Sequence, residues 1–293
     1  MSSLPRPAAP AQEETRGVLA IPAFRKLWNS MLFSSLGDWL GLLATTALAQ
    51  QLSGDNYAKA NFAIAGVFIA RLLPSVFLGP LAGVLADRFD RRKLMVVCDI
   101  LRTGLYISIP IFHNYFWLYT ATILVECVTL FWSPAKEASV PNLVPRNKLE
   151  SANQVSLLAA YGTAPIAAII FSILALFSNA FNALLPSFAT NAVDIALYIN
   201  AASFAFAAYT VWGLHEIPKI KDSKKDSEVG VAKSLWQGWK AVSGSKIIRG
   251  LIVGMVGAFV AAGAVIGLAR TFVGDLGGGE AAYGVLFGAV FTG

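Results

Sequence analysis

The chain has 293 residues, of which 56% are hydrophobic and only 14% are charged. Soluble domains carry about 25% charged residues, and the apolar residues here gather in blocks of roughly 20, the length that a helix needs to cross a bilayer. These features exclude an ordinary soluble domain and predict an all-α, polytopic membrane protein. The formal net charge is +6, but the basic residues lie in short loops between apolar blocks, so nucleic acid is not an expected partner.

The predicted elements begin with a polar segment, residues 1–26, that is rich in Pro and Ala and lacks the apolar core of a signal peptide. We expect this segment to be a disordered cytoplasmic tail. Six predicted spans then form an N-terminal transmembrane bundle, residues 27–214, with individual spans at about 27–49, 60–86, 94–112, 116–140, 155–177 and 188–214.

A charged, Lys-rich cytoplasmic linker is predicted at residues 215–246, and a second transmembrane bundle begins at 247–293. Its first span covers about 247–272, and the next opens near residue 282. Six spans, a charged linker and further spans are typical of transporters built from two parallel repeats. Since the sequence ends inside an apolar segment, we expect it to be truncated at its C-terminus.

The distribution of Lys and Arg predicts the orientation in the membrane. Of the 23 such residues, 19 fall in the N-terminal tail and on alternate loops, whereas only Lys59 and Arg270 fall on the opposite side. Positive charge concentrates in cytoplasmic loops. We therefore expect a multi-pass protein of the cell membrane with its N-terminus in the cytoplasm.

The residues that usually form enzyme or metal sites do not cluster in this sequence. Cys98 and Cys127 both fall inside predicted spans, and His113 and His215 are far apart along the chain. This usage excludes a disulfide framework and gives no metal-ligand spacing. Neither a nucleophile–base set nor a phosphate-binding loop is evident, so we expect no enzyme activity, no metal and no cofactor.

The loop between the second and third predicted spans reads Gly-Val-Leu-Ala-Asp-Arg-Phe-Asp-Arg-Arg-Lys, residues 83–93. It resembles the signature loop of the major facilitator superfamily, Gly-x-Leu/Val-x-Asp-Arg-x-Gly-Arg-Arg/Lys. Asp90 stands where that family usually has Gly. The residues that match in place are Gly83, Asp87, Arg88, Arg91 and Arg92.

The form Asp-Arg-Phe-Asp-Arg-Arg is similar to the bacterial macrolide-efflux and drug:proton antiporter branch of this superfamily. Other stretches that resemble the same branch are 35–38, 73–74, 79–83, 134–138, 141–145, 149–153 and 283–286. The resemblance implies the major-facilitator fold, of which the six-helix N-terminal bundle and the start of the second bundle are present, about 7.5 of 12 transmembrane helices. It also implies a monomer in contact with membrane lipids that transports a small molecule by alternating access, with the proton gradient as energy source.

The signature loop is expected to form part of a cytoplasmic gate. Asp87, at a helix end, can accept hydrogen bonds from the backbone donors of another helix N-terminus. Arg91 can make a charge-assisted bond to a carboxylate across the bundle. The resemblance implies that the partner of Asp87 lies in the second bundle.

The fifth predicted span carries a degraded antiporter motif. It reads Gly162-Thr-Ala164-Pro165-Ile-Ala-Ala, in which the proline is kept and alanines replace the glycines that flank it in related exporters. Because alanine is also small, close packing of helices at this face is still expected.

Charged residues inside predicted spans mark candidate functional positions, because each costs at least about 2.5–3.5 kcal/mol on insertion scales. Asp38 and Glu126 fall near the middle of the first and fourth spans, whose counterparts in the superfamily line the central cavity. We expect one or both to carry the coupling proton and to face a cationic or amphipathic substrate. The alternative is that each is a neutralised structural group, with Asp38 paired to Arg71 of the second span.

Two further intramembrane charges, Asp99 and Arg102, lie three residues apart on the third span and predict a local ion pair that supports the signature loop. With Arg71 they are expected to act as structural counter-charges.

The sequence leaves three functions open. The first is proton-coupled export of drug-like or amphipathic small molecules. The second keeps the fold but exports a lipid or siderophore, or takes up a nutrient. The third is a membrane scaffold or sensor that does not transport.

Overall fold

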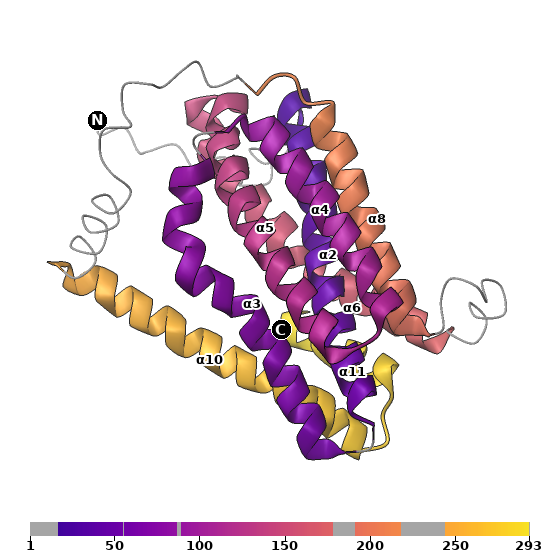
Figure 1. Ribbon diagram of the computed structural model, residues 1–293. Coiled ribbons are helices and arrows are strands. Elements are labelled where there is room, and N and C mark those ends of the chain that lie inside the picture. Colours follow the sequence, from indigo (N-terminus) through magenta and orange to yellow (C-terminus); the bar gives the residue numbers. More distant parts are fainter. Residues whose placement is uncertain (1–16, 55, 87–88, 178–190, 218–243, 293) are drawn as a thin grey trace, which may run out of the picture.

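The computed structural model describes residues 17–54, 56–86, 89–177, 191–217 and 244–292. Every regular element within these residues is helical (Figure 1), which confirms the predicted all-α fold. The elements are α2 (Pro22–Ser53), α3 (Tyr57–Ala86), α4 (Arg91–Phe112), α5 (Tyr115–Leu143), the 3-10 helix η1 (Arg146–Lys148), α6 (Leu149–Leu176), α8 (Ala192–Trp212), α10 (Lys246–Asp275) and α11 (Glu280–Thr292).

The six predicted spans of the first bundle correspond to α2, α3, α4, α5, α6 and α8, and each holds a segment long and apolar enough to cross a membrane. The seventh and eighth correspond to α10, with 30 residues, and to α11, with 13. Two helices begin well ahead of the predicted spans: α2 begins at Pro22, ahead of residue 27, and α6 begins at Leu149, ahead of residue 155. Proline is favoured in the first helical turn, as at the start of α2. Residues 1–16 and 218–243 lie outside the described residues.

Local capping explains why the long helices begin and end where they do. The side chain of Asn114 accepts a hydrogen bond from the backbone N–H of Trp117 at 2.8 Å, and Asn191 accepts from Val193 and Asp194, both at 3.0 Å. Each bond satisfies a donor that the first helical turn leaves without an intrahelical partner. Between α4 and α5 the chain reverses at His113, whose φ of 44° is in the left-handed region.

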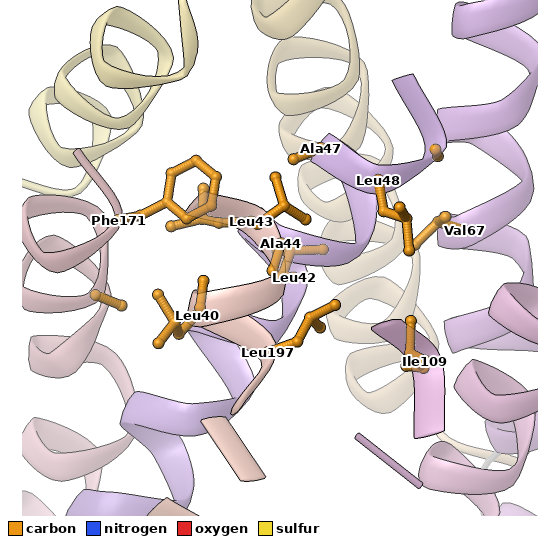
Figure 2. Close-up of a cluster of buried hydrophobic side chains, with 14 of the residues drawn as sticks. Leu40, Leu42, Leu43, Ala44, Ala47, Leu48, Val67, Ile109, Phe171 and Leu197 are labelled. Carbon is orange, nitrogen blue, oxygen red and sulfur yellow. The ribbon is translucent and has the colours of Figure 1, made fainter. Parts of the chain in front are cut away.

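The helix α2 is the centre of the bundle. It packs mainly against α8 and α6, while α3 packs against α5 and α4 packs against both α5 and α8. Figure 2 shows side chains of α2 surrounded by residues from other helices. The labelled neighbours are Val67, Ile109, Phe171 and Leu197, all buried.

The close approach of α2 and α8 depends on two glycines of α2. A Cβ atom at Gly37 would collide with the side chains of Ser203 and Asn200 of α8. A Cβ atom at Gly41 would collide with Asn200 and would lie 2.8 Å from the Tyr106 hydroxyl oxygen. The glycine spacing of four residues puts both on one helix face, so the helices come together without a side chain between them.

The bundle has two ends, which we call proximal and distal. The proximal end holds the first turns of α2, α4 and α6, and the distal end holds their last turns. In Figure 1, α10 meets the bundle at the distal end, where it crosses α3, and diverges from the bundle toward its own first turn. The adjoining helix α11 packs against α6.

The glycine face of α2 gives a first prediction. Gly41→Ala is expected to lower stability by about 1–3 kcal/mol, since the added methyl group overpacks the contact with Tyr106 and Asn200. The matched control is Gly104→Ala on α4, where a Cβ atom would meet nothing within 4 Å. Thermal unfolding in detergent micelles measures both, and equal melting temperatures for the two variants would contradict the packing role of Gly41.

Candidate functional site

Five charged side chains lie near the middle of the bundle helices. Two of them form an ion pair between α3 and α5: the Arg71 Nε donates to Glu126 Oε1 at 2.9 Å. The two side chains are 16% and 17% exposed, so water reaches both only in part. The Arg71 Nη2 also lies 3.5 Å from the backbone carbonyl oxygen of Asp38 in α2.

A second ion pair lies on α4. Arg102 donates to Asp99, and both side chains are completely buried. The other oxygen of Asp99 accepts from the Trp132 indole at 3.2 Å. The Arg102 guanidinium lies over the rings of Trp132 and Phe204, with its central carbon 4.9 and 4.4 Å from their centroids. Among the described residues, its Nε and Nη1 have no hydrogen-bond acceptor, so the aromatic faces are their main electrostatic partners.

Asp38 is the fifth charged residue and stands between these two pairs. Its strongest charged neighbours are Arg102, Glu126 and Arg71, from α4, α5 and α3, followed by the more distant Lys136. In the part of the chain that the structure describes, the Asp38 carboxylate has neither a hydrogen bond nor an ion pair. Both arginines already have a carboxylate partner, so Asp38 is the surplus acid of the cluster.

These positions answer the sequence-based expectations one by one. Arg71 pairs with Glu126, not with the Asp38 carboxylate, and reaches only the Asp38 backbone. The predicted Asp99–Arg102 pair is present. It lies about two turns into α4, which begins at Arg91. The role of the pair in supporting the signature loop stays a prediction.

The signature loop is described only in part. Gly83 belongs to the last turns of α3, and Asp87 and Arg88 lie outside the described residues. Arg91 donates to the backbone carbonyl oxygen of Ala138 at 2.9 Å, which ties the start of α4 to α5. The Arg92 guanidinium lies over the ring of Trp212 in α8, 5.6 Å from its centroid.

The departure from the family pattern at Asp90 has a local explanation. Its side chain accepts a hydrogen bond from the backbone N–H of Lys93 at 3.1 Å and caps the first turn of α4. Aspartate is among the best residues at this position, and glycine serves there almost as well. Asp90 therefore gives α4 a side-chain cap that glycine cannot provide.

The antiporter-like motif lies inside α6. Pro165 is in the helix interior, Ala164 is fully buried, and Gly162 is half-buried. One turn later, a Cβ atom at Gly284 of α11 would lie 3.0 Å from the carbonyl oxygen of Ala168. The small residues of this face therefore adjoin the contact between α6 and α11.

Sequence reasoning missed the role of two residues. Trp132, which binds Asp99, gave no signal, because an apolar span normally contains such residues. Arg270 was counted with the basic residues outside the membrane spans, although it falls within the predicted span 247–272. The structure buries it to 2% exposure. Its position inside an apolar block was the signal that could have identified it.

Comparison with known proteins matches nearly the whole chain to one family. Residues 15–293 match the model of the transmembrane secretion effector family. An uncharacterized MFS-type transporter of Bacillus subtilis, YfiS, is 30% identical over 190 residues, 64% of this chain and 41% of the relative.

Two relatives have names that state a function. Macrolide efflux protein A of Streptococcus pyogenes is 27% identical over 198 residues, 64% of this chain and 44% of the relative. The putative bacilysin exporter BacE of Bacillus subtilis is 28% identical over 125 residues, 42% of this chain and 30% of the relative. The chain spans less than half the length of each of these curated relatives.

The buried pair on α4 gives a second prediction. Asp99→Asn should destabilise the bundle by about 3–5 kcal/mol, because Arg102 then stays buried without the carboxylate to which it donates. The double variant Asp99→Leu with Arg102→Met removes both charges and should recover most of the loss. Chemical unfolding in detergent measures the free energy of unfolding of both variants. A double variant no more stable than the single one would show that the unpaired charge of Arg102 is not the cause of the loss.

Proposed function

Because the chain belongs to the major facilitator superfamily, as a member of its transmembrane secretion effector family, we propose that it is a proton-coupled exporter of amphipathic, drug-like small molecules. It would work by alternating access, with the two bundles rocking against each other. The named efflux relatives support export as the direction of transport. The charge distribution supports a cytoplasmic N-terminus, which would make the proximal end the cytoplasmic one.

The observation that carries the proposal is the surplus carboxylate. Two arginines and three carboxylates share the bundle interior, and Asp38 has no partner of its own among the described residues. Adding one proton to Asp38 neutralises the cluster, and releasing it leaves one net negative charge. Coulomb energies are large in a low-dielectric interior, so the protonation state of Asp38 affects the whole group.

Glu126 is assigned the second role. When Asp38 is charged, Arg71 is shared between its ion pair with Glu126 and the field of Asp38. When Asp38 takes up a proton, Arg71 is held by Glu126 alone. A cationic substrate near Glu126 would compete with Arg71 for the same carboxylate. Proton and substrate would thus act on one ion pair, which is the coupling that an antiporter requires.

Transport assays on variants of the two acids test the proposal. In vesicles that contain the protein, Asp38→Asn should abolish the dependence of cationic-dye efflux on the pH gradient, because the group that takes up the proton is gone. Glu126→Gln should reduce the rate at every pH, because Arg71 then lacks its partner. Initial rates of dye efflux at several imposed pH gradients give both readings.

Glu150→Gln is the control, since Glu150 lies in the first turn of α6 with an exposed side chain and has no ion pair among the described residues. Its efflux should follow the parent protein. If Asp38→Asn keeps the parent's pH dependence, Asp38 does not carry the proton. If the parent moves no dye under any gradient, export of such compounds is wrong and the scaffold alternative gains support.

A further inference from the structure

Arg270 of α10 makes a concentrated set of contacts at the distal end of the bundle. Its Nε donates to Gln50 Oε1 at 2.7 Å, and its Nη2 donates to Glu280. Its Nη1 lies 3.4 Å from both the Leu43 carbonyl oxygen and the Thr46 hydroxyl. A guanidinium that is 2% exposed needs such partners, because an unpaired buried charge is costly.

The partners of Arg270 come from both parts of the chain. Gln50, Thr46 and Leu43 belong to α2, the central helix of the first bundle. Glu280 and Tyr283 belong to α11, and the Arg270 guanidinium lies over the Tyr283 ring, 4.4 Å from its centroid. One side chain therefore connects α10 and α11 to the first bundle.

A second contact closes the same end of the molecule. The Ser172 hydroxyl oxygen of α6 lies 3.1 Å from the backbone carbonyl oxygen of Ala281, and 2.9 Å from that of Ala168 in its own helix, so the hydroxyl proton is shared between the two acceptors. Just beyond it, a Cβ atom at Gly288 would touch that of Ala168 at 3.4 Å. The distal ends of α2 and α6 are thus both joined to the segment formed by α10 and α11.

The proximal half of α10 differs sharply. Ile247 is 77% exposed, Leu251 63% and Val253 71%, and a Cβ atom at Gly250 or Gly254 would meet nothing within 4 Å. In Figure 1 this half of α10 points away from the bundle. The described helices are therefore closed against one another at the distal end and separated at the proximal end.

A small cavity adjoins the Arg270 contacts. It has a volume of about 140 Å³ and is lined by polar and apolar residues, among them Gln50, Arg270, Glu280 and Tyr283. Water can occupy a space of this size when polar partners are present. Such water could replace the hydrogen bonds of Arg270 as the helices separate.

We propose that Arg270 is the latch of a distal gate, and that its bonds to Gln50 and Glu280 hold α2 closed against α10 and α11. The proposal rests on the proposed transport function, in which this gate opens to the outside while the signature-loop side closes. When the latch is made, the distal end is sealed. When its bonds are exchanged for water, the distal end opens.

Chemical labelling of a single cysteine tests the latch without any substrate. The parent carries Ser172→Cys, with Cys98 and Cys127 replaced by Ser, because residue 172 is buried at the α6–α11 contact. A membrane-impermeant maleimide is added to intact cells, and the rate of modification is measured. Arg270→Gln should raise that rate at least about tenfold, since a bond to a charged group is removed from the closed state.

Gln50→Glu should do the opposite and lower the rate below that of the parent, because it places a carboxylate opposite Nε and strengthens the bond. If these substitutions merely loosened or misfolded the protein, the labelling rate would rise for Gln50→Glu as well as for Arg270→Gln. Arg249→Gln is the control, since it removes a positive charge from an exposed position of the same helix. Its rate should equal that of the parent.

Three results would overturn the latch: a parent rate for Arg270→Gln, an increased rate for Gln50→Glu, or an Arg249→Gln rate as high as that of Arg270→Gln. The transport proposal fails separately, by the pH dependence of Asp38→Asn. A latch that behaves as expected in a protein that moves no dye would show a gated bundle with another cargo.

Discussion

The imbalance between acids and bases inside the bundle is the constraint on which the rest of the structure depends. A lone carboxylate in an apolar interior would be too costly to keep charged, whereas a fully paired one would have no reason to exchange its proton. Asp38 lies between these limits. The arginines of the two neighbouring ion pairs, Arg102 and Arg71, attract a negative charge on Asp38 without bonding to its carboxylate, whereas Glu126 repels that charge.

The packing of α2 sets the surroundings of Asp38. Gly37 and Gly41 bring α8 into direct contact with one face of the helix, and this contact leaves the neighbouring position, Asp38, close to α3, α4 and α5. The last turns of α2 carry Thr46 and Gln50, which bind Arg270. One helix therefore presents its packing face, its acid and its distal contacts at successive turns.

Much of this architecture could be predicted from sequence, because span length and the sidedness of Lys and Arg are properties of the linear chain. The Asp99–Arg102 pair could be predicted too, since residues three apart share a helix face. The partner of Arg71 could not, because the choice between Asp38 and Glu126 depends on how three helices are rotated about their axes. Arg270 could have been placed inside a span, because it falls within the apolar block 247–272, but its partners on α2 and α11 depend on how the helices pack.

Two tryptophans of α2 have a mechanical consequence. The indole N–H of Trp28 donates to the Val155 carbonyl at 3.0 Å, and that of Trp39 donates to the Ala160 carbonyl at 2.8 Å. Two rigid side chains, about three turns apart along α2, thus attach this helix to α6 by hydrogen bonds. When one of the two helices tilts, the other must tilt with it. The helices α2 and α6 therefore move as one unit, whose distal end makes the contacts with α10 and α11.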